Sequence, residues 1–285
     1  MAKDAVTDRV VEANERLVLE VKEKYGRIAE TGGSCSPSGG SIPCCGGSSQ
    51  AMSLQIGYKK EDHKAVPEGA DLGLGCGAPI PHLELKPGEV VLDLGSGGGL
   101  DAFLSARAVG PTGRVIGVDM TPAMLERART NATKAGFANV EFREGRLEAL
   151  PVDAGTIDAV TSNCVINLVP DKSKVFLEIA RVLKPGGRVV ISDILLDGPL
   201  PESLAQDVYA YVGCISGAAQ RADYFGKLAA AGLGQVTLIK DVDYLSALIE
   251  AAPAEADALL AKHGLGRDAV RGLVRSVTYR AVKPA

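Results

Sequence analysis

Residues 90–101 read VVLDLGSGGGLD, an apolar run with one acidic residue that leads into a cluster of glycines. Four of its first five residues are apolar, as is typical of a strand that is buried on both faces of a sheet. The glycines that follow let the backbone turn sharply and approach a ligand closely. These twelve residues therefore predict a strand, a glycine-rich loop and the start of a helix.

The same alternation of apolar runs and helical patterns continues along the chain. Further strands are expected at 114–120, 140–145, 156–163 and 187–195, and helices at about 99–109, 122–135 and 172–183. Residues 184–187, KPGG, predict the end of a helix and a turn into the next strand. This order is typical of βαβ units, and it predicts an α/β fold with a doubly wound, mostly parallel, seven-stranded Rossmann-like sheet.

Three segments are expected along the chain. Residues 1–69 would form an amphipathic helix over about 5–29 and a flexible loop over 31–50, TGGSCSPSGGSIPCCGGSSQ, because the loop is rich in Gly, Ser and Pro. Residues 70–200 would form the ligand-binding core. Residues 201–285 would add helices near 201–214, 221–232 and 245–262, a strand at 236–242 and a strand at 277–283 that closes the sheet.

The composition excludes several classes of protein. With 285 residues, 46% of them hydrophobic and 23% charged, the chain is long enough to bury a core, and it has no apolar stretch of bilayer length. A net charge of −4 without a basic tail argues against nucleic-acid binding, and a small-molecule partner is the better expectation. The charged start MAKDAVTDRV lacks the features of a secretory signal and predicts a cytoplasmic protein.

The spacing of the glycines indicates which cofactor the loop binds. A dinucleotide fingerprint that starts at Gly95 would need glycine at position 100, where this chain has leucine, so the pattern favours S-adenosylmethionine over NAD. Asp119 ends the second predicted strand and could accept hydrogen bonds from both ribose hydroxyls, while Met120 could pack on the adenine. The alternative is that the glycines form only a turn and that Asp119 only caps a helix. The cofactor site is predicted to comprise Asp93, Gly95, Ser96, Gly97, Gly99, Asp119, Met120 and Asn163.

The positions of three cysteines suggest a site for a thiophilic ion. Cys164 follows the fourth predicted strand, Cys76 precedes the core and Cys214 lies beyond it, so the fold could bring three soft ligands together above the cofactor. Each could instead be an ordinary buried small hydrophobe. A zinc site is a further possibility, although the adjacent Cys44 and Cys45 lack the spacing that suits tetrahedral zinc.

Five segments together carry a closer resemblance: GLGCG (73–77), DLGSGGGLD (93–101), SNCVINL (162–168), KPGG (184–187) and GCISGA (213–218). With them the chain resembles the arsenite S-adenosylmethionine methyltransferases, within the class I methyltransferases. The resemblance implies detoxification of trivalent arsenic, with arsenite or a thiol conjugate held by Cys76, Cys164 and Cys214 and with Cys44 or Cys45 taking part. It also implies thioredoxin or glutathione as reductant, and backbone contacts to the adenine from the segment that contains Arg146 and Leu147.

One departure and one absence qualify this interpretation. Many relatives carry an aromatic pair just before the GCG segment, where this chain has Leu72-Gly73-Leu74, so a tyrosine contact there is not expected. None of the three histidines, His63, His82 and His263, ends a strand of the core, so no general base is evident. Oxygen and nitrogen nucleophiles usually need such a base, whereas arsenic(III) attacks through a lone pair. The alternatives are a quinone- or sterol-type methyltransferase and a non-catalytic thiol metal sensor.

Overall fold

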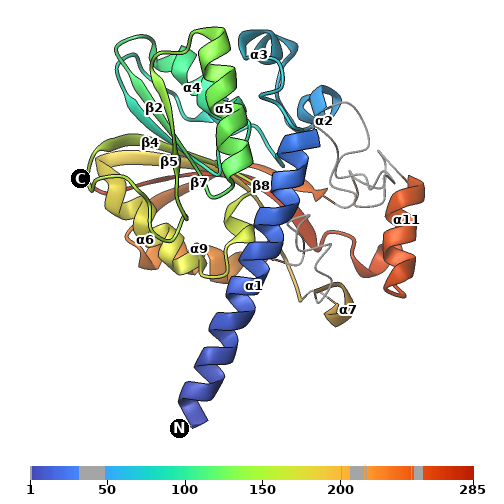
Figure 1. The fold of residues 1–285 in the computed structure, drawn as a ribbon. Coiled ribbons are helices and arrows are strands. Elements are labelled where there is room, and N and C mark those ends of the chain that lie inside the picture. Colours follow the sequence, from blue (N-terminus) through green and yellow to red (C-terminus); the bar gives the residue numbers. More distant parts are fainter. Residues whose placement is uncertain are drawn as a thin grey trace.

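A computed structural model of the chain describes residues 2–31, 49–199, 201–205, 215, 217–244, 246 and 253–285. Its centre is one sheet with helices on both faces (Figure 1). The strands lie in the order β3 (Val140–Glu144), β2 (Arg114–Asp119), β1 (Val90–Leu94), β4 (Ile157–Asn163), β5 (Leu183–Leu196), β8 (Val274–Val282) and β7 (Gly234–Asp243). The first five are parallel, and β8 runs antiparallel to β5 and β7. The short β6 (Ala219–Gln220) pairs with β5.

Strand β1 lies where the strand order reverses, because β2 and β3 lie on one side of it and β4 and β5 on the other. Ligands of open α/β sheets bind at such a switch point, outside the carboxyl ends of the strands. The register brings the ends of three strands level, since Leu94 is paired with Val118 on β2 and with Ser162 on β4. Gly95, Asp119 and Asn163 directly follow these three residues in the chain. They therefore share one edge of the sheet.

Alternate residues of the strands point to two separate cores, as expected for a sheet covered on both faces. Val91 and Val115 pack with α4 (Leu100–Val109) and α5 (Pro122–Ala135). Leu92 and Ile116 belong to a core that also contains residues of α6 (Lys172–Val182) and α9 (Arg221–Ala230). The predicted doubly wound α/β fold is thus confirmed.

The N-terminal helix packs beside the site edge of this core. Helix α1 (Ala2–Thr31) is long, and its N-terminal end projects beyond the body of the molecule (Figure 1). Near its C-terminal end Ile28 and Ala29 pack against Met124 of α5, and Arg127 donates a hydrogen bond of 2.8 Å to the Ala29 carbonyl. Helices α2 (Ser49–Ile56) and α3 (Lys60–Ala65) and the 3-10 turn η1 (Ile80–His82) lead into β1.

Beyond β5 the described residues form, besides β6, α9, β7 and β8, the helices α7 (Glu202–Ala205) and α11 (Pro253–Lys262) and the 3-10 turn η3 (Arg267–Ala269). A further turn, η2 (Ile166–Leu168), follows β4. The helix expected near 201–214 is described only over α7, and the helix expected at 245–262 is described only at Ser246 and over α11. Most of the loop expected at 31–50 lies outside the described residues.

One expectation about the sheet was wrong in detail, and a second is made more specific by the structure. The KPGG segment does end the helix, at Val182, but it lies within β5, where the register against β4 shifts between Ile157 and Ala159. Gly186 has a φ of 75°, which favours glycine, and the segment forms an irregularity rather than a separate turn. The C-terminal strand β8 joins the sheet between β5 and β7, a position that the sequence prediction did not specify.

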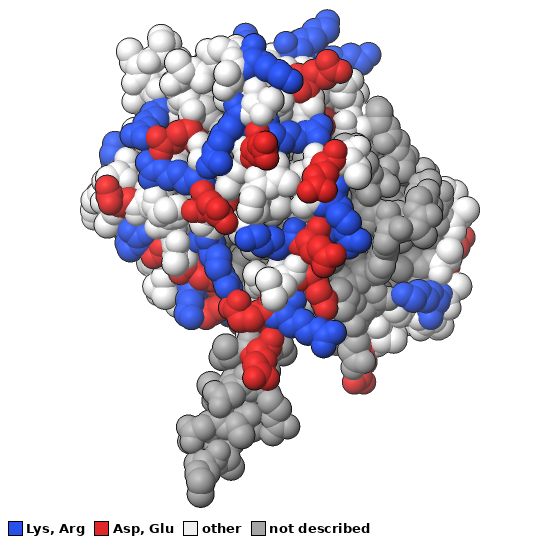
Figure 2. Space-filling model, in the orientation of Figure 1, with Lys and Arg blue, Asp and Glu red and all other residues white. Residues whose placement is uncertain are grey.

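The surface agrees with the composition. Figure 2 shows Lys and Arg interspersed with Asp and Glu over the visible face, without a continuous basic patch. None of the helices in the described part of the chain is long and apolar enough to cross a membrane.

Candidate functional site

A pocket opens at the carboxyl ends of β1, β2 and β4, and its empty space is about 1130 Å³ with the open mouth included. Helix α1, the glycine loop, the segment 145–148 and the turn after β4 line it. Most of the residues predicted to bind the cofactor line this pocket: Asp93, Gly95, Ser96, Gly97, Asp119, Met120, Arg146, Leu147 and Asn163. Gly99 does not; it is the residue before α4, with a φ of 96°.

Backbone hydrogen bonds hold the glycine loop in place. The amides of Gly95 and Ser96 donate to the carbonyl of Val118 on β2, at 2.8 and 3.1 Å. The amide of Gly97 donates to Asp119 Oδ2 at 3.0 Å, and the amide of Thr121 donates to Asp119 Oδ1 at 2.8 Å. A Cβ atom at Gly95 would lie 2.4 Å from Val165, so a side chain there would displace the turn that follows β4. The loop and the Asp119 carboxylate therefore form one ordered unit.

Three carboxylates gather around this pocket. Asp93 and Asp101 are buried, and Asp119 is half-buried. Burial, together with the like charges of Asp101 and Asp119, raises the pKa of Asp93 well above its ordinary value. Burial also raises the pKa of Asp119, and it raises that of Asp101 to about 6. Because carboxylates that share a desolvated site resist ionisation together, the pocket would gain stability from a cationic ligand.

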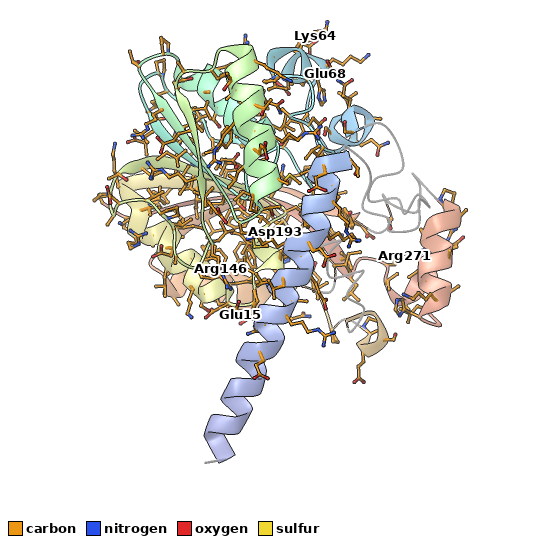
Figure 3. All side chains as sticks on the ribbon, viewed as in Figure 1. Glu15, Lys64, Glu68, Arg146, Asp193 and Arg271 are labelled. Carbon is orange, nitrogen blue, oxygen red and sulfur yellow. The ribbon has the colours of Figure 1, made fainter. Side chains whose placement is uncertain are left out.

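No lysine or arginine is free to neutralise these acids within the described lining. Arg146 is the only Lys or Arg among the described residues that line the pocket, and two other carboxylates already hold it. Its guanidinium donates to Glu15 of α1 at 2.8 Å and to Glu148 at 3.1 Å. Figure 3 shows Arg146 and Glu15 beside α1. Asp93 Oδ2 is buried and has no hydrogen-bond partner within the described residues.

A buried hydrogen-bond network joins the carboxylates to the end of β4. Tyr58 donates to Asp101 Oδ1 at 2.6 Å, and Asn163 Nδ2 lies 2.9 Å from the Tyr58 hydroxyl. The same Nδ2 donates to the Gly77 carbonyl at 2.7 Å, while Asn163 Oδ1 accepts from the amide of Cys76 at 3.0 Å. Asn163 thus connects the acidic side of the pocket with the loop that carries Cys76.

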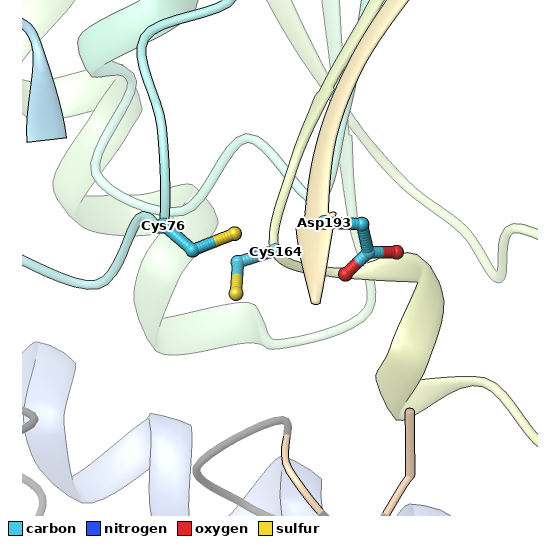
Figure 4. Close-up of side chains that lie close together, drawn as sticks. All are labelled: Cys76, Cys164 and Asp193. Atoms are coloured by element: carbon cyan, nitrogen blue, oxygen red, sulfur yellow. The ribbon is translucent and has the colours of Figure 1, made fainter. Parts of the chain in front are cut away.

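Two thiols lie close together where this network ends. Cys76 and Cys164 are both buried, and Figure 4 shows their side chains beside that of Asp193 on β5. One ligand atom from each of the three, Sγ of the cysteines and a carboxylate oxygen of Asp193, lies within 4.8 Å of the other two. Cys164 also lines the pocket, whereas Cys76 lies behind the pocket residue Gly75.

The backbone of each cysteine is fixed by a neighbouring strand. The Cys76 carbonyl accepts a hydrogen bond of 2.6 Å from Ser276 on β8. The Cys164 amide donates to the Ser192 carbonyl on β5 at 2.8 Å, and Cys164 has a φ of 60°. A positive φ is uncommon for a residue with a side chain and costs on the order of 1–2 kcal/mol. Such strain is found chiefly where the position of a side chain matters for function.

The surroundings of the thiols are apolar. Val21 of α1, Ile194, Leu260 and Val274 pack in one cluster with the two cysteines. Asp193 is fully buried, and it accepts hydrogen bonds from the Ile194 amide at 3.0 Å and from the Tyr224 hydroxyl at 3.2 Å. Burial raises the pKa of Asp193 to about 7. The thiol side of the pocket is therefore shielded from water.

Three of the cysteines that the sequence singled out lie outside the described residues. They are Cys44, Cys45 and Cys214. The structure brings Cys76 and Cys164 together, as the sequence predicts, and it places Asp193 beside them.

Three side chains of this site were not predicted: Tyr58, Asp101 and Asp193. Asp101 ends the quoted motif and begins the helix after the glycines, so its position pointed to the pocket. Asp193 is an acid within an apolar strand, a pattern that calls for a buried partner or a functional role. Tyr58 precedes β1 by more than thirty residues, and no local pattern pointed to it.

Comparison with known proteins identifies similar chains. A family model described as a methyltransferase domain matches residues 85–250. An arsenite methyltransferase from Halobacterium salinarum is 44% identical over 82% of this chain and 60% of its own length, and one from Aquipseudomonas alcaligenes is 39% identical over 70% and 56%. The chain thus spans less than two thirds of these curated relatives.

A solved structure is similar over a larger share of its length. It is an arsenic(III) S-adenosylmethionine methyltransferase from Chlamydomonas reinhardtii, with a TM-score of 0.60 and 30% identity. The match covers 86% of this chain and 75% of that one.

Proposed function

Because this chain belongs to the arsenic(III) S-adenosylmethionine methyltransferases, a family with the methyltransferase domain, we propose that it methylates trivalent arsenic held by its cysteines. The observation that carries the proposal is the buried pair Cys76 and Cys164 at the end of an acidic pocket. The biological role that follows is detoxification of arsenic.

The acidic pocket fits S-adenosylmethionine. This cofactor is a cation, with a sulfonium and an ammonium group, and when bound it supplies an electrophilic methyl group. The pocket has three carboxylates with raised pKa values, and Asp93 Oδ2 has no hydrogen-bond partner among the described residues. Asp93 would accept from the ammonium group and Asp119 from the ribose hydroxyls. Met120 and the segment with Arg146 and Leu147 would contact the adenine.

The thiols fit the substrate. Arsenic(III) is soft, and thiolate sulfur is the protein ligand that it prefers. Arsenite would condense with the Cys76 and Cys164 thiols, forming two As–S bonds and releasing two molecules of water that carry the thiol protons. The hydrogen bonds from Ser276 and to Asn163 fix the Cys76 backbone, so the arsenic would be held at a defined place beside the pocket. Cys214 would be a third ligand.

The arrangement needs no general base for the methyl transfer itself. The arsenic lone pair is the nucleophile, and it carries no proton. The contribution of the protein is therefore to hold the two reactants in line at about 3–3.5 Å and to exclude water. The apolar cluster around the thiols, with Val21 and Val274, supplies that exclusion.

Turnover would need a source of electrons. Methylation converts arsenic(III) into arsenic(V), and two thiols that form a disulfide can reduce it again. Cys44 or Cys45 would be one of these thiols, and thioredoxin or glutathione would restore the reduced state. We place this chemistry in the cytoplasm, where thiols stay reduced.

The deciding experiment is incubation of the purified full chain with arsenite, glutathione and S-adenosylmethionine labelled in its methyl group. Labelled methylarsenic should form in the wild type and should be absent with Cys164→Ser, which replaces a soft ligand by a hard one. Methylation of a demethylmenaquinone-type quinol, with no arsenic turnover, would contradict the proposal and favour a quinone methyltransferase.

A further inference from the structure

We propose that Cys76, Cys164 and Asp193 form a binding site for a thiophilic divalent cation, Zn²⁺ or Cd²⁺, which competes with arsenic for the same two thiols. The three side chains come from distant parts of the chain, the loop before β1, the end of β4 and the middle of β5. Figure 4 shows the thiol groups of Cys76 and Cys164 side by side, with the Asp193 carboxylate nearby. This inference shares its thiols with the proposed function but does not depend on methyl transfer.

The donor set suits zinc better than it suits arsenic. Two thiolates and one carboxylate combine soft and hard ligands, a mixture that a borderline ion such as Zn²⁺ accepts. Arsenic(III) would use the two sulfurs and has little need for the carboxylate. Asp193 therefore distinguishes the two occupants of the site.

The geometry requires only a small adjustment. In a tetrahedral zinc site with Zn–S of about 2.3 Å and Zn–O of about 2.0–2.2 Å, neighbouring ligand atoms are roughly 3.5–3.8 Å apart. The three donor atoms here lie within 4.8 Å of one another, so each pair must close by at most about 1.3 Å. Because Cys164 also lines the pocket, the fourth position can face it and take a water molecule.

The surroundings support a buried ion. The Asp193 oxygens accept from the Ile194 amide and the Tyr224 hydroxyl, and these bonds orient the carboxylate as ligands in metal sites are oriented. Two thiolates and a carboxylate carry one negative charge more than Zn²⁺ neutralises. The ammonium group of Lys172 donates to the carbonyls of Asn167 and Val169, and the Asn167 side chain donates to the carbonyl of Ile194, which follows Asp193. The positive charge of Lys172 would offset part of that excess.

The test is a titration of the full chain with Zn²⁺ alone, in buffer that contains a phosphine reductant and no thiol or S-adenosylmethionine. Calorimetry gives the affinity, and Co²⁺ absorbance reports thiolate ligation and tetrahedral geometry. The wild type should bind one ion. Asp193→Asn should lower the affinity by about tenfold or more, since even outer partners of a metal ligand contribute this much. Asparagine keeps the hydrogen bond from Ile194, so the fold should persist.

Two controls and one competition complete the experiment. Asp197→Asn removes a carboxylate four residues away that pairs with Arg221 at the surface, and it should bind Zn²⁺ as the wild type does. Cys164→Ser should lose the thiolate absorbance. Arsenite should still bind to Asp193→Asn, and Zn²⁺ should raise the apparent Kd of arsenite in the wild type.

Two results would overturn the proposal. Equal Zn²⁺ affinity in Asp193→Asn and the wild type would remove the carboxylate from the site. Loss of Zn²⁺ binding in Cys214→Ser would assign the third position to that cysteine instead. The titration needs no turnover, so it can be interpreted even if no methylated arsenic forms. Absence of arsenic methylation would contradict the proposed function and would not affect the assignment of the Zn²⁺ site.

Discussion

The two ends of the pocket differ in chemistry and in the way the chain builds them. At the glycine-loop end, hydrogen bonds from backbone amides hold Asp119, and three hard carboxylates crowd one site. At the thiol end, Cys76, Cys164 and Asp193 lie among apolar side chains. One end is suited to a hard, cationic ligand and the other to a soft one.

The difference shows how one pocket can keep two reactants apart. Sulfur ligands attract arsenic but contribute little to a cationic cofactor, and carboxylates do the reverse. Asn163 and Tyr58 connect the two ends by side-chain hydrogen bonds. Variants on either side should therefore affect one ligand and spare the other.

The largest effect is expected for Cys164→Ser. Loss of a sulfur ligand should lower kcat/KM for arsenite at least about a thousandfold, or roughly 4 kcal/mol, because the arsenic is no longer placed for attack. The affinity for S-adenosylmethionine should stay within about twofold of the wild type, since the substitution does not change the carboxylates at the glycine-loop end. Steady-state kinetics and calorimetry measure the two quantities. A parallel loss of both would show that the ends are not independent.

The next largest effect is expected in the pH dependence of stability, and it arises from Asp101 at the glycine-loop end of the pocket. Burial raises the pKa of Asp101 from 3.8 to about 6, so the folded state binds the proton more tightly than the unfolded state. This stabilisation is complete below pH 3.8 and is lost as the pH rises through about 6. The free energy of unfolding without cofactor should fall by about 3 kcal/mol more over this range in the wild type than in Asp101→Asn.

Denaturant unfolding at several pH values measures this difference. Asp153→Asn, which alters an exposed acid, serves as the control and should follow the wild-type profile. Identical profiles for the wild type and Asp101→Asn would contradict the assignment of the titration to Asp101.

A smaller effect is expected at the ribose contact. Asp119→Ala should weaken S-adenosylmethionine binding by about 1.5–3 kcal/mol, because a charge-assisted pair of hydrogen bonds is lost. Arsenite binding to the thiols should not change. Calorimetry with each ligand separately is the measurement, and Asp153→Ala is the matched control. Undiminished cofactor affinity would remove Asp119 from the site.

These two ends also differ in how well the sequence predicted them. The glycine loop, its strand and Asp119 follow one another within a local pattern, because a strand end, a tight turn and a helix start each have their own residue preferences. The alternation of strands and helices then predicts a mostly parallel sheet. The positions of β2, β4 and α5 were accordingly predicted to within one residue of their bounds.

The thiol end depends on contacts between segments far apart in the chain. Cys76 is separated from Cys164 by 88 positions, and Ser276, which bonds its carbonyl, is 200 residues away. No local sequence pattern predicts such a contact. The insertion of β8 between β5 and β7 was missed for the same reason, since an apolar run predicts a strand and not its neighbours. The roles of Tyr58 and Asp193 likewise depend on contacts that form only in the folded chain, so the sequence did not predict them.

The smallest expected effect tests the link between the two ends. Tyr58→Phe removes the hydroxyl that donates to Asp101 at 2.6 Å and faces Asn163 Nδ2 at 2.9 Å, and it leaves the buried ring in place. Cofactor affinity should fall by about 1 kcal/mol, the usual net value of one hydrogen bond. Arsenite affinity without cofactor should hold, because Asn163 keeps its bonds to Cys76 and Gly77.

The informative quantity is the coupling between the ligands. If the hydrogen bonds of the Tyr58 hydroxyl couple Asp101 to Asn163, saturating S-adenosylmethionine should alter the arsenite affinity of the wild type. It should alter the arsenite affinity of Tyr58→Phe less. A double-mutant cycle with Asn163→Ala separates this coupling from simple loss of packing. Additive effects in that cycle, with cofactor influence unchanged, would mean that the two ends share a pocket without sharing a network. Non-additivity of about 0.5 kcal/mol or more would place the connection at this one hydroxyl.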